Sequence, residues 1–208
     1  MGKQTPIHQL ALTAASTAEL MTVYDDWAAD YDQDLIGEWG YSAPERVAHF
    51  LKQYLRGAAA KVVDAGCGTG LVGHCLRDSG FVHIDGIDCS QAMLEQARGK
   101  QVYETLHCLD MNKPLPLASA AYDGVTCVGT FTSAHVHPEA LRELIRITRP
   151  GGVLSFTVRL EYWQATNFRE LLVQLDTAGE ACLEELRTEP YVESEGSFCK
   201  LVVLRVPG

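Results

Sequence analysis

One stretch of the sequence decides the fold class: VVDAGCGTG, residues 62–70. It opens with a β-branched apolar pair, reaches the carboxylate of Asp64, and then alternates glycines up to Gly70. A strand that runs into a glycine loop and a helix start has this pattern, because glycine lets the backbone turn sharply and approach a ligand closely. The stretch therefore predicts a ligand-binding loop at the carboxyl end of a sheet strand.

Around this loop, short β-branched runs alternate with helical periodicity, which is typical of a parallel sheet whose strands are joined by helices. The sequence predicts strands at 61–64, 82–88, 102–109, 122–129 and 153–158, and helices at 71–78, at 90–97 and from Pro138 to a stop signal at 149–152. Two further strands, at 182–191 and 198–206, are expected to form a hairpin around 193–197.

Helices are expected before this block, because residues 13–56 have helical rather than alternating periodicity. Ser42 and Glu45 have the spacing of a capping box, and an apolar face follows them. Asn167 and Glu170 repeat that spacing in front of a second apolar face.

The glycine loop is compatible with two kinds of ligand. Gly68, Gly70 and Gly73 satisfy G-x-G-x-x-G, and Asp88 follows Gly68 by twenty residues, as in a dinucleotide site. A pyrophosphate beside the loop would be repelled by Asp64, whereas a ligand that carries an ammonium and a sulfonium would be attracted by it. The sign of this carboxylate favours S-adenosylmethionine over NAD.

The run DAGCGTG at 64–70 resembles the first motif of the class I S-adenosylmethionine-dependent methyltransferases. The resemblance continues in order through four further segments: GIDCSQAML at 86–94, LDM at 109–111, YDGV at 122–125 and RPGG at 149–152. It implies an α/β fold: a Rossmann-like, doubly wound, seven-stranded and mostly parallel sheet with a C-terminal antiparallel hairpin and N-terminal lid helices. Within the family, the length, the lid segment and the closing hairpin resemble the methyltransferase-like proteins.

The same resemblance implies S-adenosyl-L-methionine as the cofactor and S-adenosyl-L-homocysteine as the product. Asp88 would then accept hydrogen bonds from the ribose hydroxyls and Asp110 from the adenine amino group. Met111 would either pack on the adenine ring or donate its backbone amide. Ordinary loop chemistry is the alternative for Asp110. The residues expected to bind the cofactor are Trp27, Tyr31, Asp64, Gly66, Cys67, Gly68, Gly70, Asp88, Cys89, Met93, Asp110, Met111, Val128 and Thr130.

The segment YDDWAADYD, residues 24–32, looks like the aromatic lid of this family. Tyr24, Trp27 and Tyr31 have the spacing of one helical face, so a plain core stripe is the alternative. In a lid, such rings would exclude water and attract a sulfonium.

Candidates for catalysis are few. His135 is a candidate base or acceptor contact, with a surface-loop histidine as the alternative, and Tyr31 is a candidate from the lid. Residues 159–163, which include Arg159, Tyr162 and Trp163, are expected to flank the same cleft. No metal is expected, because no third ligand stands near His135 and His137.

Composition limits the partners. The 208 residues are 47% hydrophobic and carry a formal net charge of −10, which suits one domain with a full core and disfavours nucleic acid and anionic membranes. We expect a single domain, with a lid at 1–57 and a core at 58–208, acting as a monomer. No apolar run approaches the roughly 20 residues of a membrane span, and no secretory signal stands at the amino end. Seven cysteines without a C-x-x-C pair indicate a cytoplasmic location, with the nucleus as the alternative.

The expected function is methyl transfer from S-adenosylmethionine to an unidentified acceptor, with a small molecule favoured over a protein. Two alternatives stay open. One is a cofactor-binding module with little or no turnover that acts through a protein partner. The other, an NAD-dependent oxidoreductase, is disfavoured by Asp64 and by the shortage of chain for a separate substrate domain.

Overall fold

The protein folds around one seven-stranded sheet, seen in a computed structural model that describes residues 7, 10, 11, 14, 16–55, 57, 59–132 and 136–208. The strand order is β3-β2-β1-β4-β5-β7-β6. The first five of these strands are parallel, and β7 is antiparallel to β5 and β6 on either side of it. The strands are β1 (Lys61–Ala65), β2 (His83–Asp88), β3 (Thr105–Cys108), β4 (Tyr122–Phe131), β5 (Thr148–Arg159), β6 (Cys182–Pro190) and β7 (Phe198–Arg205).

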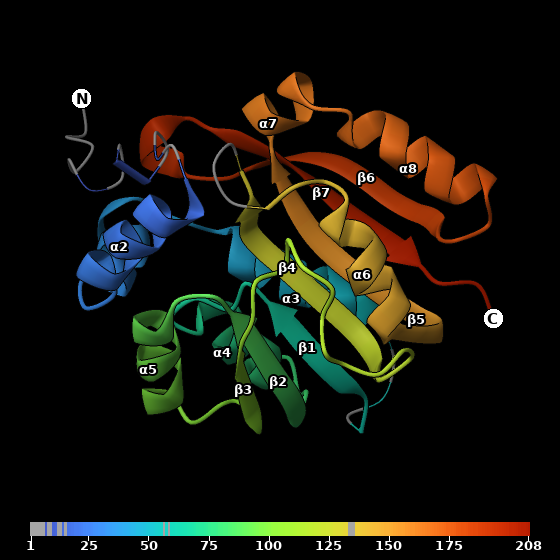
Figure 1. The fold of residues 1–208 in the computed structure, drawn as a ribbon, viewed down its shortest axis with the longest axis horizontal. Helices are drawn as coiled ribbons and strands as arrows, with labels where there is room; N and C mark the ends of the chain where they lie inside the picture. The colour runs from blue at the N-terminus through green and yellow to red at the C-terminus, as the bar shows by residue number, and fades with distance from the viewer. Residues whose placement is uncertain are drawn as a thin grey trace.

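Helices cover both faces of the sheet, with α3 and α4 on one face and α6 and α8 on the other (Figure 1). The helices are α2 (Thr17–Trp27), α3 (Ala43–Tyr54), α4 (Leu71–Asp78), α5 (Gln91–Gly99), α6 (Ala140–Ile147), α7 (Leu160–Ala165) and α8 (Phe168–Thr177), with a π-helical turn η1 (Gln33–Glu38) and a 3₁₀ turn η2 (Glu193–Glu195). The predicted α/β fold, with its mostly parallel sheet and C-terminal hairpin, is confirmed. Among the described residues, none of the helices combines the length and the apolar character that a membrane span requires.

Successive residues of the central strands contribute to two separate cores. Val62 and Ile84 pack with α3 and α4, whereas Val63 and Ile87 pack with α6 and α8. Side chains alternate across a strand, so a strand covered on both faces needs apolar residues at consecutive positions. This is why β1 has a continuous apolar run.

Several local predictions were wrong. Neither Ser42 nor Asn167 caps its helix with its side chain; the Ser42 hydroxyl instead accepts from the guanidinium of Arg46 at 3.3 Å. The strand predicted at 102–109 is shorter, because the carbonyl of Val102 accepts from Arg77 instead of joining the sheet. The helix that was predicted to end at the stop signal 149–152 does end directly before it, at Ile147, but β5 begins at Thr148, so the signal itself lies inside that strand.

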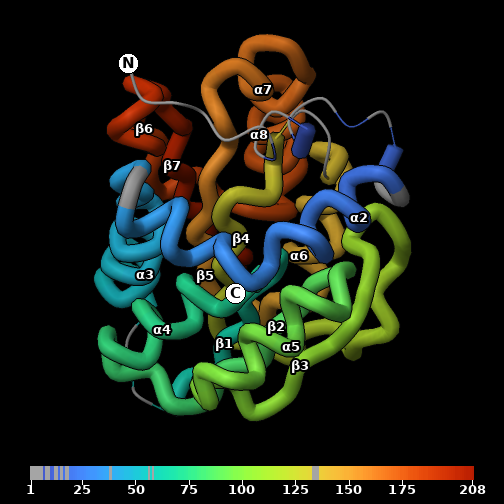
Figure 2. The backbone as a smooth tube through the Cα atoms, turned by 90° about the vertical axis from the view of Figure 1, so that its left-hand side faces the viewer, coloured from blue at the N-terminus to red at the C-terminus, as the bar shows by residue number. Residues whose placement is uncertain are grey.

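The segment α2 lies beyond the carboxyl ends of the parallel strands, which point toward it in Figure 1. Seen from that side, α2 runs across the front of the sheet and the glycine loop lies behind it (Figure 2). Open α/β sheets bind ligands at this edge, so the amino-terminal segment is placed as a cover over the expected site.

Candidate functional site

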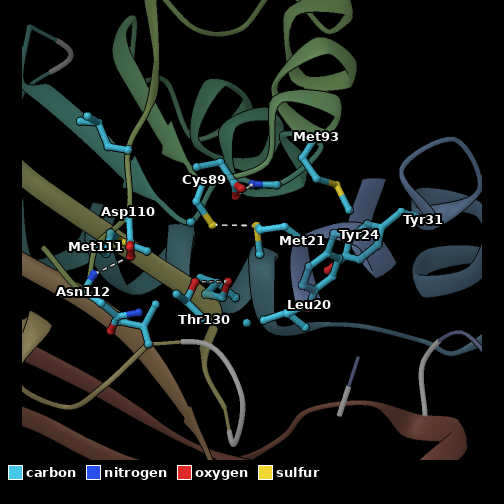
Figure 3. Close-up of a pocket in the computed structure, with 17 residues that line it drawn as sticks. Leu20, Met21, Tyr24, Tyr31, Cys89, Met93, Asp110, Met111, Asn112 and Thr130 are labelled. Carbon is cyan, nitrogen blue, oxygen red and sulfur yellow. Dashed lines mark hydrogen bonds between the residues drawn. The ribbon is translucent and has the colours of Figure 1, made fainter. Parts of the chain in front are cut away.

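A cleft lies between the carboxyl edge of the sheet and α2. It encloses about 650 Å³, including its open mouth. The lid contributes Leu20, Met21, Tyr24 and Tyr31, and the loop after β1 contributes Gly66 and Gly68. In Figure 3 the lid side chains face Asp110, Met111 and Asn112 across the cleft, with Thr130 of β4 at its base.

The backbone of the glycine loop forms one wall of the cleft, and the loop can lie close to the end of β4 because Gly66 has no side chain. Gly66 has a φ of 75°, and a Cβ on it would lie 2.2 Å from Oγ1 of Thr130. Any other residue would therefore push the loop away from the end of β4. The backbone N–H of Gly68 points to Asp88 and donates to its Oδ2 at 2.8 Å.

Asp88 ends β2 and is fixed in the cleft wall by backbone donors. Its Oδ2 accepts from Gly68, and its Oδ1 accepts from the N–H of Ser90 at 2.9 Å. Burial raises the pKa of this carboxyl, and the backbone hydrogen bonds oppose the rise. The result is an oriented carboxylate that can accept hydrogen bonds from a ligand.

Asp64 does not line the cleft, contrary to the reasoning that used its charge. It is fully buried behind the loop, where it accepts from the Tyr103 hydroxyl at 2.7 Å and from the Thr126 hydroxyl at 2.9 Å. Burial raises the pKa of Asp64 to about 6. It supports the glycine loop from inside the protein.

The charge argument instead applies to the carboxylates that face the cleft. Asp88 and Asp110 are the only charged side chains among its described lining residues. Asp110 accepts from the N–H of Asn112 at 2.9 Å and pairs with Lys113 at 3.3 Å, so part of its role is to shape its own loop. Two carboxylates and no lining cation disfavour a pyrophosphate and suit a ligand with positive charge.

Sulfur-containing side chains line the part of the cleft near α5. Cys89 Sγ lies 3.0 Å from Sδ of Met21, Met93 lines the same side, and Met111 faces them across the cleft (Figure 3). Burial raises the pKa of Cys89 to about 12, so the thiol is neutral and a weak nucleophile. Polarizable, adaptable side chains of this kind suit a flat apolar ring.

The lid aromatics cluster, but they do not share one helix. The helix α2 ends at Trp27, and Tyr31 follows after a turn. Ring centroids are 6.2 Å apart for the stacked pair Tyr24 and Trp27, and 4.7 Å apart for Trp27 and Tyr31. Trp27 does not line the cleft and donates from its indole to Asp34 at 2.8 Å.

Polar contacts hold the lid against the loop. Asp32 accepts from the Thr69 hydroxyl and from the Lys100 ammonium, each at 2.5 Å, and Lys100 also donates to the carbonyl of Thr69 at 2.6 Å. Further along the cleft, Ser90 donates to Asp25 of α2 at 2.6 Å.

Ten of the fourteen residues expected to bind a cofactor line this cleft. The other four, Trp27, Asp64, Cys67 and Gly70, do not line it, and Trp27 lines a neighbouring cavity instead. His135 lies outside the described residues. Leu20, Met21, Asn112 and Val136 also line the cleft and were not expected. The sequence offers one signal for the first two, since they precede Tyr24 by four and three residues and so share its helix face.

Residues after β5 are divided between the core and a neighbouring cavity. Tyr162 is buried and donates to the carbonyl of Val136 at 3.0 Å, and Trp163 stacks on Phe168. Neither lines the cleft, contrary to expectation, because α7 turns these rings toward α8. Arg159 lines the cavity next to the cleft.

Comparisons with known proteins agree with this geometry. A family model described as a methyltransferase domain matches residues 63–156. Methyltransferase-like protein 27 of Homo sapiens is 38% identical over 170 residues, which are 78% of this chain and 68% of that protein. The predicted resemblance to the methyltransferase-like proteins is thereby confirmed.

More distant matches are partial or structural. Malonyl-[acyl-carrier protein] O-methyltransferase of Enterobacter lignolyticus is 39% identical over 98 residues, 47% of this chain and 38% of that protein. A solved complex of the Haloferax volcanii Trm112 methyltransferase activator with a methyltransferase gives a TM-score of 0.65 at 22% identity, covering 89% of this chain and 98% of that one. At that identity the match shows the fold alone.

Proposed function

Because the chain belongs to the class I S-adenosylmethionine-dependent methyltransferases, we propose that its cleft binds S-adenosylmethionine and that the protein transfers the methyl group to a small-molecule acceptor. The observation that carries this proposal is the charge of the cleft: its described lining presents two carboxylates and no cation beside a glycine loop. S-adenosylmethionine presents an ammonium and a sulfonium, which suit such a lining.

In this proposal, different residues of the cleft bind different parts of S-adenosylmethionine. Asp88 accepts from the ribose hydroxyls, while Cys89, Met93 and Met111 pack on the adenine. Gly66 and Gly68 let the backbone approach the methionine end. Their positive φ angles, and the clash that a Cβ on Gly66 would cause, support this assignment.

S-adenosylmethionine, when bound, supplies a methyl group whose bond to sulfur breaks, with the electron pair going to sulfur, as the carbon bonds to the nucleophilic atom of the acceptor. The chain's own task is then to align the acceptor and to exclude water. Tyr31 serves this task by closing the cleft. Burial raises the pKa of Tyr31 far above its ordinary value, so its phenol is protonated and is not the base. His135 stays the candidate base for acceptors that lose a proton.

The acceptor is proposed as a small molecule, since no basic surface stripe for nucleic acid is expected at a net charge of −10. The malonyl-acyl carrier O-methyltransferases are matched over less than half of their length, so their acceptor is not carried over. The single domain, the monomeric state and the cytoplasmic location remain predictions.

The test is a thermal unfolding scan with S-adenosylmethionine, S-adenosylhomocysteine, NAD and NADP in turn. A ligand at about 100 times its Kd stabilises by about 2.7 kcal/mol, which raises the Tm of a chain of this size by about 5 to 10 °C. We expect the shift with the first two ligands only. A shift with NAD or NADP alone would overturn the proposal.

A measurement of turnover distinguishes a methyltransferase from a cofactor-binding module without activity. Formation of S-adenosylhomocysteine that depends on an added acceptor supports the transferase. Binding without turnover, across acceptors that offer N, O and S nucleophiles, supports a cofactor-binding module that acts through a protein partner.

A further inference from the structure

A second cavity adjoins the cleft and shares three residues with it: Tyr24, Tyr31 and Gly129. It encloses about 470 Å³, including its opening. The shared residues lie at the lid and at the carboxyl end of β4. A molecule in this cavity would therefore be next to whatever occupies the cleft.

Five of the eleven described residues that line this cavity are aromatic, and they come from distant parts of the chain. The lid supplies Tyr24, Trp27 and Tyr31, packed on one another. Tyr41 and Tyr191 meet edge to face, with ring centroids 5.2 Å apart. Rings favour offset-stacked and edge-to-face contacts with other rings, so this lining suits a planar aromatic ligand.

Two phenol oxygens mark the boundary between the cavities. Gly129 has a φ of 75°, and a Cβ on it would lie 2.9 Å from the Tyr41 hydroxyl and 3.5 Å from the Tyr191 hydroxyl. Tyr41 donates to Tyr191 at 3.4 Å, which uses one of their two hydroxyl hydrogens. Burial raises the pKa of Tyr41 and raises that of Tyr191 to about 12. The pair is therefore a neutral hydrogen-bonding group beside the cleft.

The one charge in the described lining of the cavity is paired with carboxylates that lie outside the lining. Arg159 is the only charged side chain there, and its guanidinium lies 5.9 Å from the Tyr191 ring. It donates to Glu195, whose side chain is 8% exposed, at 2.9 Å, and to the exposed Glu161 at 3.1 Å. An anionic ligand meets a cation that is already paired, and a cationic ligand meets no counter-ion. Either would lose hydration without full compensation.

We infer that this second cavity is the acceptor site and that it takes a planar, uncharged aromatic molecule whose polar group hydrogen-bonds to the Tyr41–Tyr191 pair. The inference rests on the proposed function, which places the methyl donor in the adjoining cleft. Ring lining selects for planarity, and the balanced guanidinium selects against charge. The phenol pair orients the ligand at the boundary.

The first experiment compares probes of one shape and different charge. Isothermal titration calorimetry measures the binding of 2-naphthol, 2-naphthoate and 2-naphthylmethylammonium to protein saturated with S-adenosylhomocysteine, which fills the cleft. We expect 2-naphthol to bind tighter than either ion by about tenfold or more. Decahydro-2-naphthol, which keeps the hydroxyl but is not planar, should bind more weakly than 2-naphthol. Equal or tighter binding of a charged probe, or no binding of 2-naphthol, overturns the inference.

Two variants place the ligand in this cavity. Tyr41→Phe removes one phenol and should weaken 2-naphthol binding by about threefold to tenfold while leaving the affinity for S-adenosylhomocysteine unchanged. Tyr54→Phe is the matched control, because that hydroxyl donates to Glu185 on another surface. Equal effects of the two variants would contradict the assignment.

The charge balance gives a sharper test. Glu195→Gln leaves Arg159 with less counter-charge, so the ratio of 2-naphthoate to 2-naphthol affinity should rise by about fivefold or more. Glu184→Gln is its control, because Glu184 lies on β6 and the substitution removes the same charge from an ion pair with Arg205 of β7. An unchanged ratio in Glu195→Gln overturns the role of the paired arginine in excluding anions.

The two proposals fail in different ways. A protein that does not bind S-adenosylhomocysteine overturns the proposed function and this inference with it. A protein that binds S-adenosylhomocysteine but prefers a charged or saturated probe overturns the acceptor class alone.

Discussion

Two aspartates at the carboxyl ends of neighbouring strands, Asp64 and Asp88, have different roles. Asp64 lies near the end of β1 and is fully buried, whereas Asp88 ends β2 and is partly exposed in the cleft wall. Asp64 faces the side-chain hydroxyls of Tyr103 and Thr126, so it holds the loop from behind. Asp88 faces backbone N–H groups at the cleft, so its carboxylate is available to a ligand.

The variant Asp88→Asn tests this assignment. The amide has one carbonyl oxygen in place of two charged acceptors, so the affinity for S-adenosylhomocysteine should fall by about tenfold or more, as expected for a hydrogen bond to a charged group. Calorimetry measures the Kd. The control is Asp78→Asn at the end of α4, whose carboxylate is exposed and contacts His74. If both variants bind equally well, Asp88 has no ligand role.

Asp64 should make stability depend on pH. Its pKa in the folded protein is about 6, raised from 3.8, so the folded state holds this proton to higher pH than the unfolded state does. The free energy of unfolding should therefore fall as pH rises between these values, by about 2 to 3 kcal/mol. The measurement is denaturant unfolding of the wild type and Asp64→Asn at pH 4 to 7. The difference between the two should shrink or reverse toward pH 7, and parallel profiles would contradict the argument.

At the scale of elements, the lid is held by contacts at several points along it and not by one continuous helix. Near the loop, Asp32 binds Thr69 and Lys100. At its far end, Tyr41 pairs with Val192 through an isolated β-bridge, and the N–H of Ser194 donates to the carbonyl of Trp39 at 3.1 Å. The lid thus joins the glycine loop to the β6–β7 turn, across both cavities.

Loss of the first of these contacts should loosen the lid without unfolding the sheet. Lys100→Met removes an ion pair whose side chains are 25% and 37% exposed, so its effect on global stability should stay below about 1 kcal/mol. Limited proteolysis within residues 16–41 should become faster, and S-adenosylhomocysteine should dissociate faster. Lys200→Met, on β7, is the control. Unchanged proteolysis would show that Lys100 does not hold the lid.

At the scale of the whole molecule, the net charge predicts that nucleic acid is a poor partner. A net charge of −10 repels the phosphate backbone, and non-specific nucleic-acid binding depends on neutralising phosphates with basic residues. Fluorescence anisotropy with a labelled duplex DNA and a labelled RNA hairpin should give a Kd weaker than about 100 µM at 0.15 M salt. Binding that tightens steeply as salt is lowered would contradict a small-molecule acceptor and favour a nucleic-acid substrate.

The sheet architecture also shows what local pattern could and could not predict. Strand and helix positions followed from periodicity, because burial on one or both faces restricts side chains over a few consecutive residues. The capping boxes at Ser42 and Asn167 failed, because a cap depends on the backbone geometry of one residue and on competing partners such as Arg46. The predicted length of β3 was wrong for a similar reason, since the Arg77 guanidinium donates a hydrogen bond to the carbonyl of Val102.

The sequence by itself determined the strand, loop and helix order around residues 62–70, the family, and most of the residues along the cleft, because these features are encoded within short segments. Three features depend on the tertiary structure: the Asp64 side chain points into the protein, α2 ends at Trp27 and so does not include Tyr31, and a second cavity adjoins the cleft. Tyr41 and Tyr191 are 150 residues apart, and their contact depends on the packing of the lid against the hairpin. Local periodicity cannot predict such a contact, because it depends on how distant segments pack together in the folded protein.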